Sequence, residues 1–137
     1  MDKKRSIVLV VEDEELLLNA IILKLKLHDI DAIACKSGKE ALEILTKAEK
    51  LPDAIWLDYY LKDMNGLDFM HAIKTNEKWT HIPTIVVSNS ASPEKVTSML
   101  SLGVKKYYLK AENRLDDIIA SVKEFVEEEN KLKFAAI

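Results

Sequence analysis

Short apolar runs alternate along the chain with longer stretches in which apolar residues recur every three or four positions. The run SIVLVV at Ser6–Val11 is continuous, which is typical of a strand buried on both faces. Residues 14–28 predict a helix because Leu17, Ile21 and Leu25 recur every four positions. Further strands are predicted at residues 31–35, 54–57, 84–87 and 105–109.

Helix-start signals occupy the segments between these strands. Ser37 has the residue type of an N-cap, and Glu40, three residues later, completes a capping box. Ser92 and Pro93 likewise suit a cap and a first helical turn, and a glycine is common just after a helix end. The remaining helices are predicted at residues 65–77, from the cap Ser92 to Leu102 with Gly103 ending the helix, and along an apolar face from Leu115 to Leu132.

Five strands that are each followed by a helix imply a parallel sheet covered by helices on both faces. The 137 residues suit a single domain of ~100–200 residues, and they are too few for a barrel, which needs ~250. We therefore predict an α/β fold: a flavodoxin-like doubly wound five-stranded parallel sheet, in strand order 2-1-3-4-5, with five helices. The chain would form one domain, with a core at residues 6–128 and a C-terminal helix extension at residues 129–137.

Charge and composition narrow the class of protein. The 20 basic and 23 acidic residues give a net charge of −3, which argues against direct binding to nucleic acid or to a membrane surface. The single cysteine, Cys35, excludes an intramolecular disulfide and a multi-cysteine zinc site. No apolar run approaches the ~18 residues that a membrane-spanning helix needs. We expect a soluble, cytoplasmic domain.

Polar residues follow four of the predicted strands, at the edge where a doubly wound sheet binds its ligands. Glu12 and Asp13 follow the first strand, Asp58 the third, Ser88 the fourth and Lys110 the fifth. Each alone has a structural explanation, since an acid after a strand often caps the next helix. Together, however, three crowded carboxylates repel one another and need a proton or a cation, and oxygen ligands suit Mg²⁺. A carboxylate beside Mg²⁺ can accept a phosphoryl group, so the pattern favours an aspartyl-phosphate site.

Four stretches of the chain carry a resemblance to a known family. In them the acid pair, the aspartate, the hydroxyl and the lysine follow in the same order as in the receiver domain of bacterial two-component response regulators, the CheY-like superfamily. The resemblance runs from Ile7 to about Glu128. The matching stretches are VLVVEDEE (8–15), AIWLDYYLKDMNGLDFM (54–70), PTIVVSNSAS (83–92) and KKYYLKAE (105–112).

The resemblance implies a phospho-acceptor and a metal site. Asp58 would accept the phosphoryl group. Mg²⁺ would be held by Glu12, Asp13 and Asp58, with the backbone carbonyl of Tyr60 as a further ligand. These assignments make Mg²⁺ the expected cofactor.

The resemblance also implies how the phosphoryl group is bound and sensed. Ser88 would bind it, and Lys110 would pair with one of its oxygens. Tyr107 would be the switch aromatic, whose rotamer follows the state of Ser88. Tyr60 and Ser90 stand at the two positions that flank the phosphate and tune dephosphorylation in this family. A tyrosine at position 60 either shields the acyl phosphate from water or lies inert on the surface.

Partners follow from the same resemblance. The donor would be a sensor histidine kinase or a phosphotransfer protein, and the output would be a contact with a downstream protein. The chain would turn over no outside metabolite, at most catalysing its own phosphorylation and dephosphorylation. With no output domain in view, we expect a stand-alone receiver, a monomer or a weak dimer. Its first helix has more apolar residues than one face can bury, which indicates either scattered exposed leucines or a docking surface.

Two departures from the family pattern keep an alternative open. Ala111 follows Lys110 where the family usually has proline, and Asn89 follows Ser88 where a smaller residue is usual. The alternative is a degenerate receiver that acts as a phosphate-independent protein-interaction module. A small phosphatase with an aspartyl nucleophile is disfavoured, because the second acid that it needs would fall at Tyr60.

Overall fold

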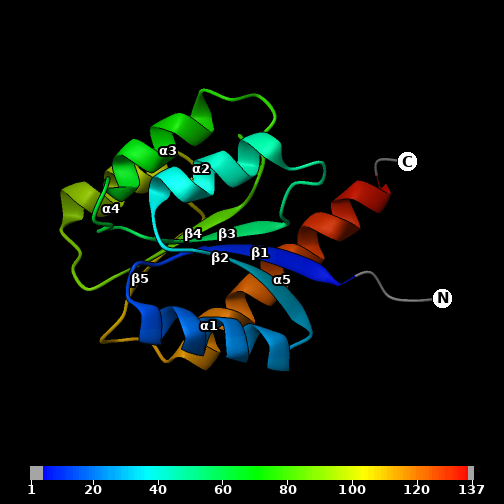
Figure 1. The fold of residues 1–137 in the computed structure, drawn as a ribbon, viewed down its shortest axis with the longest axis horizontal. Helices are drawn as coiled ribbons and strands as arrows, with labels where there is room; N and C mark the ends of the chain where they lie inside the picture. Colours follow the sequence, from blue (N-terminus) through cyan, green and yellow to red (C-terminus); the bar gives the residue numbers. More distant parts are fainter. Residues whose placement is uncertain (1–4, 136–137) are drawn as a thin grey trace.

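A computed structural model describes residues 5–135 and contains five parallel strands in one sheet (Figure 1). The strand order is β2-β1-β3-β4-β5, so the predicted fold class and order are confirmed. The elements are β1 (Ser6–Val11), α1 (Glu15–Leu27), β2 (Ile30–Cys35), α2 (Gly38–Lys47), β3 (Ala54–Asp58), α3 (Gly66–Lys74), β4 (Thr84–Ser88), α4 (Pro93–Ser101), β5 (Lys106–Leu109) and α5 (Leu115–Ala135).

The sheet lies between two helical layers. Helices α1 and α5 cover one face, and α2, α3 and α4 cover the other (Figure 1). Because side chains alternate along a strand, β1 contributes to both cores: Val8 and Val10 pack on the α1 and α5 side, whereas Leu9 and Val11 pack on the opposite side. Burial on both faces explains why this strand is apolar without interruption.

The strand register brings the carboxyl ends of the strands to a common edge. Val11 of β1 is paired with Leu57 of β3, and Ser88 of β4 is paired with Leu109 of β5. Asp58 is the last residue of β3, so the polar residues that end or follow β1, β3, β4 and β5 lie side by side. The fold thus places the predicted site at the switch point, where the strand order reverses.

Helix α3 ends earlier than the sequence pattern predicts. The prediction of a helix at residues 65–77 is wrong at its C-terminal end, because the helix stops at Lys74. The side chain of Asn76 accepts a hydrogen bond from the backbone N–H of Lys78 at 2.9 Å, and the Asn76 carbonyl accepts one from Trp79 at 3.0 Å. A short polar side chain that bonds to nearby backbone favours a turn over a continued helix.

The N-terminus of α2 has the predicted cap. The hydroxyl of Ser37 accepts a hydrogen bond from the backbone N–H of Glu40 at 3.0 Å. The Glu40 carboxylate turns back, as a capping box requires, but it accepts from the N–H of Lys36 at 3.2 Å, one residue before the cap.

The last helix runs through most of the predicted C-terminal extension. Helix α5 continues to Ala135, while residues 136–137 lie outside the described part of the chain. The proposed domain limits, 1–137 with a core at 6–128, remain a prediction. Within residues 5–135, no helix is long and apolar enough to cross a membrane.

Candidate functional site

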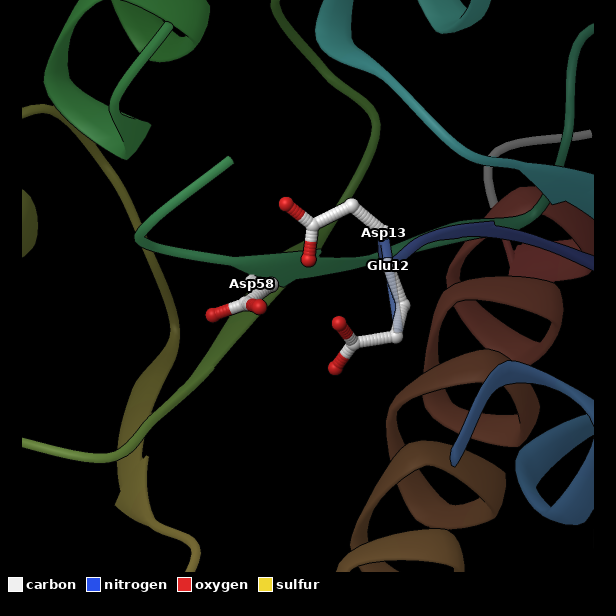
Figure 2. A group of neighbouring side chains, drawn as sticks. All are labelled: Glu12, Asp13 and Asp58. Carbon is white, nitrogen blue, oxygen red and sulfur yellow. The ribbon is translucent and has the colours of Figure 1, made fainter. Parts of the chain in front are cut away.

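Three acidic side chains meet at the carboxyl edge of the sheet. Glu12 and Asp13 follow β1, and Asp58 ends β3 (Figure 2). One carboxylate oxygen from each residue lies within 4.8 Å of the others. Glu12 is 1% exposed and Asp58 is 5% exposed, whereas Asp13 is partly exposed. An oxygen-only donor set of this size fits Mg²⁺, which binds through one or two carboxylates and keeps several waters.

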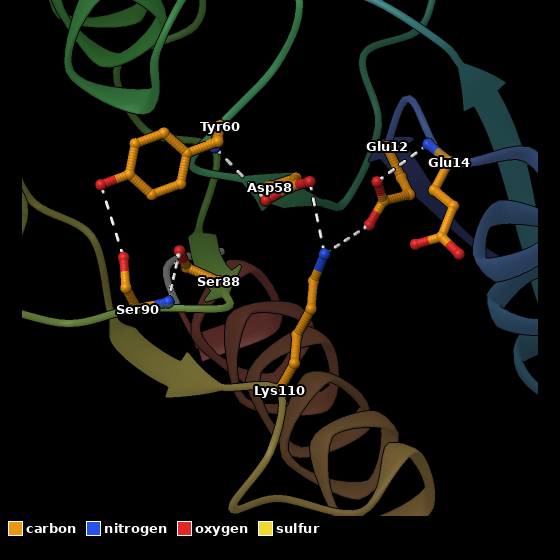
Figure 3. Close-up of polar contacts among 7 residues, drawn as sticks. All are labelled: Glu12, Glu14, Asp58, Tyr60, Ser88, Ser90 and Lys110. Carbon is orange, nitrogen blue, oxygen red and sulfur yellow. Dashed lines mark hydrogen bonds and ion pairs between the residues drawn. The ribbon is translucent and has the colours of Figure 1, made fainter.

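Lys110 is the cation beside these acids. Its ammonium nitrogen donates to Oε1 of Glu12 at 2.9 Å and to Oδ2 of Asp58 at 3.3 Å (Figure 3). The backbone N–H of Lys110 donates to the carbonyl of Ser88 at 2.8 Å, which fixes the start of the loop after β5. The described part of the chain has no cis peptide bond, so Lys110 reaches the acids with a trans bond to Ala111.

Burial and neighbouring charges shift the pKa values of Asp58 and Lys110. Burial, together with the charge of the neighbouring Glu12, raises the pKa of Asp58 to about 7. Burial by itself would lower the pKa of Lys110, but its hydrogen bond to Glu12 and the charge of Asp58 outweigh burial, and its pKa is raised. Lys110 therefore stays charged, and a proton or a second cation is needed to complete the neutralisation of the acids.

Backbone hydrogen bonds orient two of the carboxylates. Oε2 of Glu12 accepts from the N–H of Glu14 at 3.1 Å, and Oδ1 of Asp58 accepts from the N–H of Tyr60 at 3.3 Å (Figure 3). Each contact spans two positions in the chain, so both acids are held by the loop that immediately follows them. Both carboxylate oxygens of Glu12 thus accept a hydrogen bond, one from Glu14 and one from Lys110.

The loop after Asp58 turns back sharply on the sheet edge. The N–H of Gly66 donates to the carbonyl of Tyr59 at 2.6 Å. A Cβ added at Gly66 would lie 2.9 Å from the ring of Tyr59, which is closer than real Cβ contacts allow. Only glycine permits this close approach, so Gly66 closes the loop that positions Tyr60.

Ser88 and Tyr107 belong to β4 and β5, on the side of Asp58 away from β1. Ser88 is fully buried, and its Oγ accepts from the N–H of Ser90 at 3.4 Å. Tyr107 is half-buried and its hydroxyl donates to the carbonyl of Ser90 at 2.7 Å. The predicted switch aromatic therefore contacts the β4–α4 loop beyond Ser88. Asn89, between the two serines, is exposed.

The side chain of Tyr60 makes contacts that the sequence did not predict. Its hydroxyl oxygen accepts hydrogen bonds from Nζ of Lys95, on α4, and from Oγ of Ser90 at 3.4 Å. Lys95 also lies over the Tyr60 ring, 4.4 Å from its centroid. The cap at Ser92 does place Lys95 in the first turn of α4, but its side-chain direction could not be read from the sequence.

All seven candidate residues lie at or beside this one edge: Glu12, Asp13, Asp58, Tyr60, Ser88, Tyr107 and Lys110. The fold and these residues define a doubly wound α/β protein whose switch point holds acids, a lysine and a buried hydroxyl. A family model described as the response regulator receiver domain matches residues 8–123, and the chain belongs to that family.

Named relatives agree with this assignment. The chain is 31% identical over 103 residues to the two-component response regulator ORR8 of Oryza sativa subsp. indica, covering 75% of this chain and 84% of the relative. It is 28% identical over 100 residues to a chemotaxis protein CheY homolog of Campylobacter jejuni, covering 69% and 75%. A CheY-like receiver domain structure from Methanospirillum hungatei aligns with a TM-score of 0.83, 93% and 98% coverage and 20% identity, which supports the fold alone.

Proposed function

We propose that this receiver domain is a Mg²⁺-dependent phospho-acceptor in a two-component phosphorelay and that Asp58 carries the phosphoryl group. The observation that carries the proposal is the position of Asp58, whose carboxylate lies within 4.8 Å of oxygens of Glu12 and Asp13 and accepts a hydrogen bond from the ammonium group of Lys110. Receiver domains are signalling domains that interact with histidine kinases or phosphotransfer proteins.

The proposed reaction assigns a separate task to each residue. An oxygen of Asp58 forms a bond to phosphorus while the bond from phosphorus to the donor breaks, and the donor takes up a proton. Glu12, Asp13, Asp58 and the Tyr60 carbonyl would hold Mg²⁺, which when bound would neutralise charge on the phosphoryl oxygens. Lys110 would pair with one of those oxygens, and Ser88 would donate a hydrogen bond to another.

The output would be a change in protein contacts. Tyr107 and Ser88 would report the phosphorylated state through the loop that both contact. For the donor, α1 offers an exposed stripe made of Leu16, Leu23 and Leu27, which recur on one face of the helix. That the chain acts alone, as a monomer or weak dimer in the cytoplasm and without direct contact to nucleic acid or membrane, stays a prediction.

The test is the intact mass of the protein after incubation with acetyl phosphate and Mg²⁺. We expect a single added phosphoryl group on the wild type and none on Asp58→Asn. Asp63→Asn, which removes an exposed carboxylate from the following loop, is the matched control and should be labelled like the wild type.

The same experiment examines the alternative. Beryllofluoride serves as a stable mimic of the phosphoryl group where hydrolysis is fast. If the wild type takes up neither the phosphoryl group nor beryllofluoride, the chain is a phosphate-independent interaction module. Labelling of Asp58→Asn at the wild-type level would show that the acceptor is another residue.

A further inference from the structure

A side-chain bridge joins the two loops that flank Asp58 and Ser88. It begins at Tyr60, whose N–H contacts Asp58 two positions earlier, and it ends at Ser90, whose N–H contacts Ser88 two positions earlier. The Tyr60 hydroxyl and the Ser90 hydroxyl are hydrogen-bonded at 3.4 Å. Figure 3 shows this bridge on one side of Asp58 and Ser88, with Lys110 on the other side.

Lys95 holds the Tyr60 end of the bridge. Its ammonium group donates to the Tyr60 hydroxyl and lies 4.4 Å from the centroid of the Tyr60 ring and 4.8 Å from that of Tyr59. The two rings are themselves in edge contact, with centroids 4.9 Å apart. A cation over two aromatic rings and a hydrogen bond to one of them fix the rotamer of an otherwise half-exposed side chain.

The Ser90 end of the bridge is held independently. The Tyr107 hydroxyl donates to the Ser90 carbonyl at 2.7 Å, so the β4–α4 loop cannot swing away without losing that bond. Lys95 itself is fixed in the first turn of α4, because its N–H donates to the cap Ser92 at 3.2 Å. The bridge is therefore anchored on α4 at one end and on β5 at the other.

We propose that Lys95 is a positioning residue that holds Tyr60 across one side of the phosphoryl site and thereby lengthens the life of the acyl phosphate on Asp58. This inference rests on the proposed function. Hydrolysis requires a water oxygen to bond to phosphorus while the bond from phosphorus to the Asp58 oxygen breaks. Both water protons leave with the phosphate, and Asp58 returns to its carboxylate. The closed bridge restricts the approach of that water.

The size of the effect follows from the bonds that must break when the bridge opens. If water enters only through the open form, the hydrolysis rate scales with the open population. Loss of one hydrogen bond increases that population roughly 3- to 10-fold. Lys95→Ala and Tyr60→Phe both remove the hydrogen bond between these two side chains, so Lys95→Ala should speed hydrolysis by that factor. Tyr60→Phe also removes the bond to Ser90 and should speed it at least as much, and the double variant should be no faster than Tyr60→Phe alone.

The experiment follows the decay of the phosphorylated protein by intact mass after acetyl phosphate is removed in the presence of Mg²⁺. Lys95→Arg keeps a cationic donor and should restore the lifetime to within about two-fold of the wild type. Lys105→Ala removes the same charge from an exposed residue before β5, at the far end of that strand from the site, and should leave the lifetime unchanged.

The outcomes separate this inference from the proposed function. Equal lifetimes for the wild type and Lys95→Ala, or single effects that multiply in the double variant, would overturn the role of Lys95 while the phospho-acceptor stands. A wild-type protein that takes up neither a phosphoryl group nor beryllofluoride would overturn both. Faster decay of Lys105→Ala, to the level of Lys95→Ala, would assign the effect to net charge and would also overturn the inference.

Discussion

Nζ of Lys110 lies 2.9 Å from Oε1 of Glu12, although the two residues are 98 positions apart and Glu12 is almost completely buried. This ion pair links the end of β5 to the end of β1 across the site. Because Lys110 is a cation paired with the carboxylates of Glu12 and Asp58, it competes with any metal ion for their negative charge.

Replacement of Lys110 by alanine is therefore expected to strengthen Mg²⁺ binding. One positive charge fewer at the site should raise the affinity by about tenfold, or ~1.4 kcal/mol. The metal-free protein should lose ~1–3 kcal/mol of its free energy of unfolding, since the buried Glu12 is left without its oppositely charged partner and keeps only the hydrogen bond from Glu14. Mg²⁺ titration followed by the fluorescence of Trp56 measures the affinity, with Lys105→Ala as control. Weaker binding by Lys110→Ala would mean that Lys110 supports the metal site rather than competing with it.

The raised pKa of Asp58 predicts how stability depends on pH. The pKa is about 7 in the metal-free folded protein and ~3.9 for an unperturbed aspartate, so between these values the folded state binds more protons than the unfolded state. The stabilisation is present below about pH 4 and is lost as the pH rises to about 7. Urea unfolding with a chelator should show this fall, and Mg²⁺ should oppose it.

Two variants assign the pH dependence to its source. Asp58→Asn cannot titrate and should lose the fall in stability over this range. Asp63→Asn should keep it, because backbone hydrogen bonds from Lys39 and Gly38 outweigh the effect of burial and lower the pKa of Asp63, so that its contribution has the opposite sign. An unchanged fall in Asp58→Asn would place the titrating group elsewhere.

The location of the site could be predicted from the sequence, because in a parallel sheet the residues that follow each strand lie at the same edge. For that reason Glu12, Asp58 and Lys110 were predicted together, and the structure brings them within hydrogen-bond distance. The departure at Ala111 did not displace Lys110, whose backbone is held by β4. The residue after Lys110 can thus differ from the family pattern, because the pairing of β5 with β4 still holds Lys110 at the edge of the sheet.

Side-chain direction was the part that the sequence could not supply. Lys95 was visible only as one lysine in a capped helix, and its contact with Tyr60 depends on rotamers in two separate elements. The early end of α3 was missed for a related reason, since the side chain of Asn76 bonds to local backbone and favours a turn after the last apolar residue of the helix, Ile73.

Helix α1 allows a matched comparison of buried and exposed leucine. Leu25 is 0% exposed in the core under α1, whereas Leu23, on the same helix, is 61% exposed. Leu25→Ala should lower the free energy of unfolding by ~2–5 kcal/mol, because it leaves a cavity. Leu23→Ala should change it by no more than ~0.5 kcal/mol. Chemical denaturation measures both, and a large loss in Leu23→Ala would show that the exposed stripe supports the fold rather than being free for a partner.

Asp63 ties the loop after the acceptor to the start of α2. Its carboxylate accepts hydrogen bonds from the backbone N–H groups of Gly38 at 3.1 Å and Lys39 at 2.9 Å, at a helix end where negative charge is favourable. Asp63→Ala should therefore lower the free energy of unfolding by ~1 kcal/mol. Asp63→Asn, which keeps one acceptor oxygen, should lose less. Urea unfolding measures both variants, with Glu49→Ala, which removes an exposed acid outside the helix, as the control. An equal loss of stability in Glu49→Ala would show that the effect comes from net charge and that Asp63 does not anchor the loop.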